Sequence, residues 1–201
     1  MTYCLRAELY HQCPARLGEG ICWHPGCDSL AWIDILEGRV YESRSHTVRE
    51  FYCGQMVGTI APVAGGGYVA ALHDGLYLLQ TDGMLPRLVA APYDLAQFRF
   101  NDGKADRRGR LWVGTLSLTG KERTSELYCW EPGGELKPML DGISISNGLA
   151  WSSDGRRMYY IDSPTRRVRE FAFDEEDGTI GDVRTAATFV EADGLPDGCA
   201  L

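Results

Sequence analysis

The sequence lacks an excess of basic residues. Its 201 residues include 20 Lys and Arg against 28 Asp and Glu, which gives a formal net charge of −8 at pH 7. Binding to the phosphates of nucleic acids is driven by clusters of Lys and Arg. This charge balance therefore argues against a nucleic-acid partner.

Long apolar segments are also missing. The N-terminal residues contain no apolar core of a signal peptide, and the longest apolar run, residues 59–72, is interrupted by three glycines and is too short to span a bilayer. The seven cysteines are odd in number and form no C-x-x-C pair, a pattern typical of reduced thiols. We therefore expect a soluble cytoplasmic protein with no membrane partner.

Several catalytic signatures are absent as well. The sequence has no G-x-S-x-G elbow of serine hydrolases, no Walker or dinucleotide-binding glycine motif, and no H-E-x-x-H motif of zinc proteases. None of the four histidines lies in a recognised catalytic motif. Any catalytic site must therefore be built from other residues.

What the sequence does contain is a repeated strand pattern. Similar apolar cores occur at residues 30–34, 68–73, 110–116 and 158–162, about 40 to 50 residues apart, the usual length of a propeller blade. Each core is followed by a turn and a strand of alternating polarity, which buries one face and exposes the other. A β-sandwich or an irregular barrel would also show strands and turns, but the repeated order favours an all-β propeller.

The repeats predict a single domain over residues 1–201 that contains about four blades. The segment at residues 196–200 stands where a fifth core would begin. We therefore expect the C-terminal blades to be missing. Because an incomplete ring leaves strand edges exposed, we also expect a product of this length to be unstable, oligomeric or inactive.

Polar residues just before the repeated cores are candidates for a shared site. They are Glu19, Arg99, Asn101, Asn147 and Asp197. In a propeller, loops that precede the innermost strands point toward the central channel, so these side chains can converge. Two carboxylates and an amide, from Glu19, Asp197 and Asn147, offer the hard oxygen ligands preferred by Ca²⁺, Mg²⁺ and Mn²⁺.

Each candidate also has a plainer explanation. Asn147-Gly148 and the triplet at residues 196–198 have the composition of ordinary turns. Glu19 lies between two glycines, as in a solvated loop, and Arg99 could form a structural ion pair with Asp102.

Four motifs in one order carry a resemblance to a known family. They are residues 99–104 (RFNDGK), 145–152 (ISNGLAWS), 160–163 (YIDS) and 196–198 (PDG), preceded by Gly18-Glu19-Gly20. Together they resemble the senescence marker protein/regucalcin/gluconolactonase family over essentially the whole chain. The resemblance implies a six-bladed β-propeller, here truncated after about four blades. It also implies one divalent cation (Ca²⁺, Mg²⁺, Mn²⁺ or Zn²⁺) in the channel and hydrolysis of small-molecule sugar lactones.

The resemblance also assigns roles to individual residues. Glu19, Asn147 and Asp197 would hold the metal, and Arg99 and Asn101 would contact the substrate. Our hypothesis is that the cation polarises the lactone carbonyl while Asp197, the catalytic residue, takes a proton from the attacking water. The alternatives are a non-catalytic calcium-binding regulatory propeller and a propeller used only as an interaction scaffold.

Overall fold

A computed structural model describes residues 6, 8–80, 82–83 and 85–201. The described residues form four antiparallel four-stranded sheets, each with its strands in chain order. The first sheet contains β1 (Gly18–His24), β2 (Ser29–Asp34), β3 (Arg39–Arg44) and β4 (Thr47–Tyr52). The second contains β5 (Val57–Pro62), β6 (Tyr68–Leu72), β7 (Gly75–Leu79) and β8 (Arg87–Ala90).

The C-terminal half repeats this arrangement. The third sheet contains β9 (Phe98–Ala105), β10 (Leu111–Ser117), β11 (Ser125–Trp130) and β12 (Leu136–Ile143). The fourth contains β13 (Ser146–Trp151), β14 (Arg157–Asp162), β15 (Arg167–Phe173) and β16 (Ile180–Thr188), with short 3₁₀ helices η1 (Ser163–Thr165) and η2 (Glu191–Asp193). No helix in the described ranges is long and apolar enough to cross a membrane.

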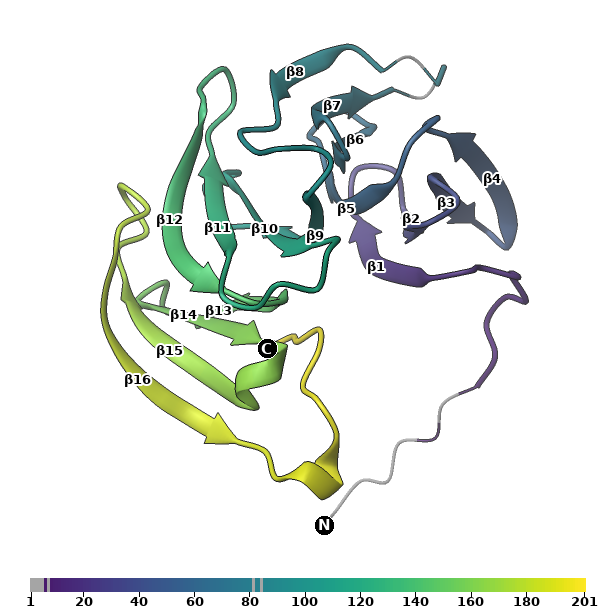
Figure 1. Cartoon of the computed structure of the whole chain (residues 1–201). Helices are drawn as coiled ribbons and strands as arrows, with labels where there is room; N and C mark the ends of the chain where they lie inside the picture. The colour runs from purple at the N-terminus through teal and green to yellow at the C-terminus, as the bar shows by residue number, and fades with distance from the viewer. Residues whose placement is uncertain (1–5, 7, 81, 84) are drawn as a thin grey trace.

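The four sheets are the blades of a propeller. Figure 1 shows them as an open arc around a common axis, with the first strand of each sheet toward the axis and the fourth strand outside. The predicted apolar cores coincide with β2, β6, β10 and β14, which are the second strands of their blades. The expectation of an all-β propeller with about four blades in this chain is thus confirmed.

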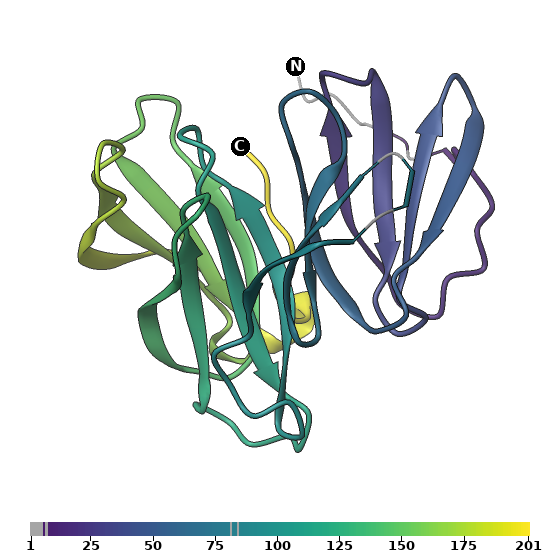
Figure 2. The ribbon, with the colours of Figure 1, turned by 90° about the horizontal axis from the view of Figure 1, so that it is seen from above.

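One detail of that expectation is wrong. The strands that line the axis are β1, β5, β9 and β13, which contact one another across adjacent blades, and most candidate residues lie within them and not in loops before them. The directions in which these side chains point at the axis are therefore determined by the geometry of the strands. Figure 2 shows the C-terminal segment, residues 194–201, passing between the first two blades and the last two.

Apolar side chains fill the three interfaces between neighbouring blades. Trp112, which is fully buried, packs between the third and fourth blades, with its ring centroid 6.2 Å from that of Trp151 and 5.9 Å from that of Phe173. Such edge-to-face aromatic contacts add to the stability gained from apolar burial. The interfaces thereby hold the first strands at fixed positions around the axis.

A buried ion pair within the third blade holds an arginine that also contacts the fourth blade. Arg110 Nε donates to Asp106 Oδ2 at 2.6 Å, and the indole nitrogen of Trp112 donates to the same oxygen at 3.1 Å. Arg110 Nη2 then donates to the carbonyl of Glu175, in the turn between β15 and β16, at 2.8 Å. That acidic turn, residues 174–177, lies at the tip of the hairpin formed by β15 and β16.

Candidate metal centre

Irregular pairing marks the first strand of every blade where that strand reaches the axis. The register with the second strand shifts between Glu19 and Cys22 in β1, between Val57 and Thr59 in β5, and between Asn147 and Leu149 in β13. In β9 the shift falls at Asn101 and Asp102. A β-bulge changes the direction in which side chains point, so each bulge lets neighbouring residues face the axis.

A cavity of about 180 Å³, called here the central cavity, lies at these bulges. Its polar lining comes from four separate parts of the chain and consists of Glu19, Asn101, Asp102, Asn147 and Asp197. Its apolar lining consists of Leu17, Ile35, Leu116 and Ile145, with Gly20 and Gly58 completing the wall. The three residues predicted to hold a metal therefore border one space.

Hydrogen bonds fix the two asparagines of the central cavity. Asn101 Nδ2 donates to the Ser146 carbonyl at 2.8 Å and to Asn147 Oδ1 at 3.1 Å. Asn147 Nδ2 donates to Ser163 Oγ at 2.8 Å. These bonds use both donors of Asn101 and one donor of Asn147, and they occupy one lone pair of Asn147 Oδ1. The second lone pair of that oxygen stays available as an acceptor or metal ligand.

Asp197 reaches the central cavity from the C-terminal segment. Its backbone carbonyl accepts a hydrogen bond from the Gly148 amide at 3.2 Å, a donor that the bulge in β13 leaves outside the sheet ladder. A Cβ atom at position 148 would lie 2.6 Å from that carbonyl oxygen. The alternative of ordinary turns does not hold, because Asn147-Gly148 lies in β13 and residues 196–198 are assigned to no turn.

Negative charge accumulates around the central cavity. Burial raises the pKa of Glu19, and the charges of Asp197 and Asp102 raise it further, while the Gly20 amide and Arg99 act in the opposite direction. Burial likewise raises the pKa of Asp102, with a smaller contribution from Asp197. Like charges held together disfavour ionisation, and a bound cation would remove this repulsion.

Arg99 does not border the central cavity. Its guanidinium is buried, and Nη1 donates to the Phe100 carbonyl at 2.8 Å and to Asn101 Oδ1 at 2.9 Å. These partners replace the ion pair with Asp102 that was the alternative for Arg99. Arg99 instead lies behind Asn101 and orients its amide.

Asp102 borders the central cavity although the sequence pattern did not single it out as a ligand. In a regular strand, Asn101 and Asp102 would point to opposite faces, so only one of them would be expected at the axis. The bulge in β9 brings both to the cavity. The only available signal was its position next to Asn101 in the RFNDGK motif.

The groups that line the central cavity are of the kinds that hold a hard divalent cation. The polar groups around the central cavity are carboxylates and amides, which are ligands for hard cations. No His or Cys of the described ranges lines this cavity. Among the residues that the structure describes, no three His, Cys, Asp or Glu side chains are grouped closely enough to hold one ion. A cation here would therefore need the Asn147 amide oxygen and water besides carboxylates.

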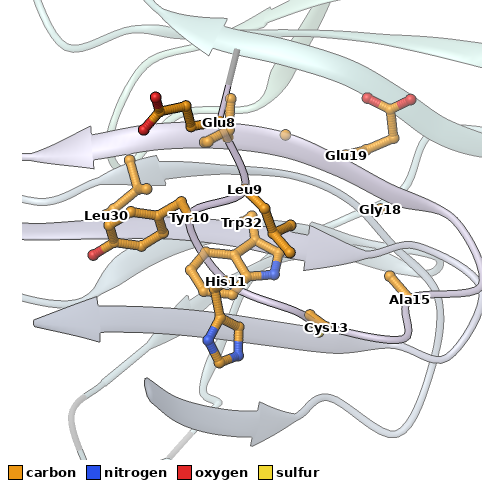
Figure 3. Close-up of a pocket in the computed structure, with 12 residues that line it drawn as sticks. Glu8, Leu9, Tyr10, His11, Cys13, Ala15, Gly18, Glu19, Leu30 and Trp32 are labelled. Carbon is orange, nitrogen blue, oxygen red and sulfur yellow. The ribbon is translucent and has the colours of Figure 1, made fainter. Parts of the chain in front are cut away.

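A second cavity, of about 450 Å³, lies between residues 8–15 and the strands β1 and β2. Figure 3 shows Trp32 near its centre, and Glu19 at one border with its carboxylate turned away from the indole. His11 contacts Trp32, with ring centroids 5.8 Å apart. Glu19 is the one polar residue that this cavity shares with the central cavity among the described residues.

The fold and the central cavity together define a class of protein, a β-propeller with an oxygen-lined site on its axis. Within that class, the chain belongs to the SMP-30/Gluconolactonase/LRE-like family, whose sequence profile matches residues 17–201. The predicted family resemblance is confirmed.

Individual relatives agree with this assignment. The chain is 33% identical to a 6-deoxy-6-sulfogluconolactonase of Pseudomonas putida, covering 94% of this chain and 66% of that protein. It is 32% identical to regucalcin of Danio rerio, covering 92% and 64%. The solved structure of a calcium-binding regucalcin from Agrobacterium tumefaciens matches with a TM-score of 0.88 and 26% identity, over 94% of this chain and 65% of that one. The chain thus spans about two thirds of the length of these proteins.

Proposed function

We propose that this chain carries the metal site of a metal-dependent hydrolase that opens small-molecule sugar lactones to aldonic acids. The observation that supports this most directly is the convergence of Glu19, Asn147 and Asp197 on the central cavity. Membership in a family that includes lactonases supports the reaction class. Gluconolactone is uncharged before hydrolysis, so the acidic charge of the chain is no obstacle to its binding.

We assign the cation site to Glu19, Asn147 and Asp197, with Asn101 and Asp102 beside them. A bound divalent cation would supply Lewis-acid polarisation of the lactone carbonyl. The all-oxygen lining favours Ca²⁺, Mg²⁺ or Mn²⁺ over Zn²⁺, because Zn²⁺ sites in proteins are commonly built with His or Cys ligands.

The residues of the chain then carry the proton transfers. The Asp197 carboxylate accepts a proton from the water that attacks the carbonyl carbon. When the bond between this carbon and the ring oxygen breaks, the proton passes to the departing ring oxygen, which becomes the hydroxyl of the aldonic acid. Asn101, held by Arg99 through the 2.9 Å hydrogen bond, orients the hydroxyl groups of the sugar.

The test is the release of acid from gluconolactone and from pentonolactones, measured against the spontaneous rate with Ca²⁺, Mg²⁺, Mn²⁺ or Zn²⁺ added in turn. We expect a metal-dependent excess that is lost in the Glu19→Gln and Asp197→Asn variants and retained in Glu131→Gln, a change at an exposed position away from the axis. A folded chain with no excess rate under any metal would contradict the proposal.

Regucalcin relatives, one of them named as calcium-binding, support a second candidate, a propeller that binds Ca²⁺ without catalysis. Calorimetric titration separates the two. Calcium binding that depends on Glu19 and Asp197, without any lactone hydrolysis, would favour the regulator.

A further inference from the structure

We propose that Ser163 and Lys104, called here the clasp, position the Asp197 carboxylate at the central cavity by holding the backbone of the C-terminal segment. The inference rests on the proposed function, since it concerns how one assigned metal ligand reaches its place. Neither residue borders the central cavity, so both act through other groups.

Hydrogen bonds from three parts of the fold hold this segment around Asp197. Ser163 Oγ donates to the Pro196 carbonyl at 2.6 Å, the Gly148 amide donates to the Asp197 carbonyl at 3.2 Å, and Lys104 Nζ donates to the Cys199 carbonyl at 2.9 Å. Residues 194–201 are assigned to no strand or helix, and these hydrogen bonds tie them to the third and fourth blades. The bonds on either side of Asp197 thus determine where its side chain begins.

Ser163 has a double role that few side chains could fill. It is buried at the start of η1, and its hydroxyl donates to the Pro196 carbonyl while accepting from Asn147 Nδ2 at 2.8 Å. A hydroxyl can do both at once because it carries one donor and two acceptor positions. One side chain thereby links the amide ligand Asn147 to the segment that carries the carboxylate ligand.

Lys104 holds the segment from a different blade. It lies on β9, in the third blade, whereas Ser163 and Gly148 belong to the fourth. The segment is therefore fixed to two blades, which defines the direction of its backbone as well as its position. The ammonium group of Lys104 is exposed, so its hydrogen bond is weaker in effect than that of the buried serine.

The position of the Asp197 carboxylate depends on the clasp, so a loss of the clasp should change the affinity for a metal ion. Residues that orient metal ligands change metal affinity by about 10- to 100-fold when they are removed. We expect Ser163→Ala to weaken Mn²⁺ binding by about that factor, and Lys104→Met by less. Ser163→Thr and Lys104→Arg keep a donor and should restore most of the affinity.

The experiment measures two quantities on the full chain. The first is Mn²⁺ affinity by calorimetry. The second is hydrogen exchange, by NMR, of the Gly148 amide without metal, because this amide donates to the Asp197 carbonyl and reports whether the segment is docked. Ser153→Ala and Lys137→Met are matched controls, since both positions are exposed and lie away from the segment.

The expected result is faster exchange at Gly148 together with weaker Mn²⁺ binding in the clasp variants, and no change in the controls. Unchanged exchange and affinity in Ser163→Ala and Lys104→Met would overturn the inference while leaving the proposed function intact. If the parent chain binds no Mn²⁺, Ca²⁺ or Mg²⁺, the proposed function is overturned. Faster exchange at Gly148 in the clasp variants would in that case still show that the clasp holds the segment. If Ser163→Ala fails to fold, the exchange rate of Gly148 in Lys104→Met decides, because Lys104 is exposed and its replacement leaves the buried contacts in place.

Discussion

Asn101 and Asn147, 46 positions apart in the chain, meet at the axis, where Asn101 Nδ2 donates to Asn147 Oδ1 at 3.1 Å. The first lies on β9 and the second on β13, so this hydrogen bond joins two blades at the central cavity. Arg99 supports the pair from one side and Ser163 from the other. The amide orientations at the candidate site are therefore set by neighbours that do not line the cavity.

Gly148→Ala tests the docking of the C-terminal segment. The added Cβ would lie 2.6 Å from the Asp197 carbonyl oxygen and 2.7 Å from Ile161 Cδ1, so the segment must move. We expect metal affinity to fall by about tenfold or more, in line with the loss of ligand orientation. Gly198→Ala is the matched control, because nothing lies within 4 Å of its Cβ position, and equal effects of the two changes would contradict this geometry.

The negative charges at the central cavity predict a pH-dependent stability. Since burial raises the pKa of Asp102 in the folded chain, ionisation of this carboxyl costs folding free energy as the pH rises through the raised pKa. Asp102→Asn should therefore stabilise the metal-free chain at pH 7 and have little effect at a pH below the ordinary aspartate pKa of 3.8. Urea unfolding with chelator at both pH values measures this, and a variant less stable than the parent chain at pH 7 would speak against it.

Metal addition should stabilise the folded chain. A ligand that binds only the folded state at 100 times its Kd adds about 2.7 kcal/mol to the free energy of unfolding, so thermal unfolding should shift upward with Ca²⁺ or Mn²⁺ and return on chelation. In Glu19→Gln and Asp197→Asn the shift should disappear. A full shift in both variants would show that the cation binds elsewhere.

The buried ion pair of the third blade predicts a large effect on folding stability and no direct effect on metal binding. Asp106→Ala leaves Arg110, whose side chain is 4% exposed, without its carboxylate, and removing one partner of a buried pair costs about 3–5 kcal/mol. Arg184→Ala breaks a pair in which the arginine is 68% exposed and should cost less than about 1 kcal/mol. Urea unfolding compares them, and similar losses would refute the special role of Asp106.

Much of the fold could be predicted because strand propensity and turn residues act locally. The apolar cores at residues 30–34, 68–73, 110–116 and 158–162 each became the second strand of a blade. Their position within the blade was misjudged, because alternation of polarity shows that a strand is half buried and does not show which neighbour it has. Three of the first strands, β1, β9 and β13, carry polar residues at the axis and so gave a weaker signal.

The sequence by itself determined the all-β repeat, the family and the short list of oxygen-bearing residues, since these follow from local pattern and motif order. Only the tertiary structure decided that Asp102 borders the central cavity, that Arg99 lies behind Asn101, and that the C-terminal segment is held on β13. The physical reason is that these contacts depend on β-bulges and on packing between blades. Both join residues far apart in the chain, and neither leaves a local pattern that a reading of the sequence could detect.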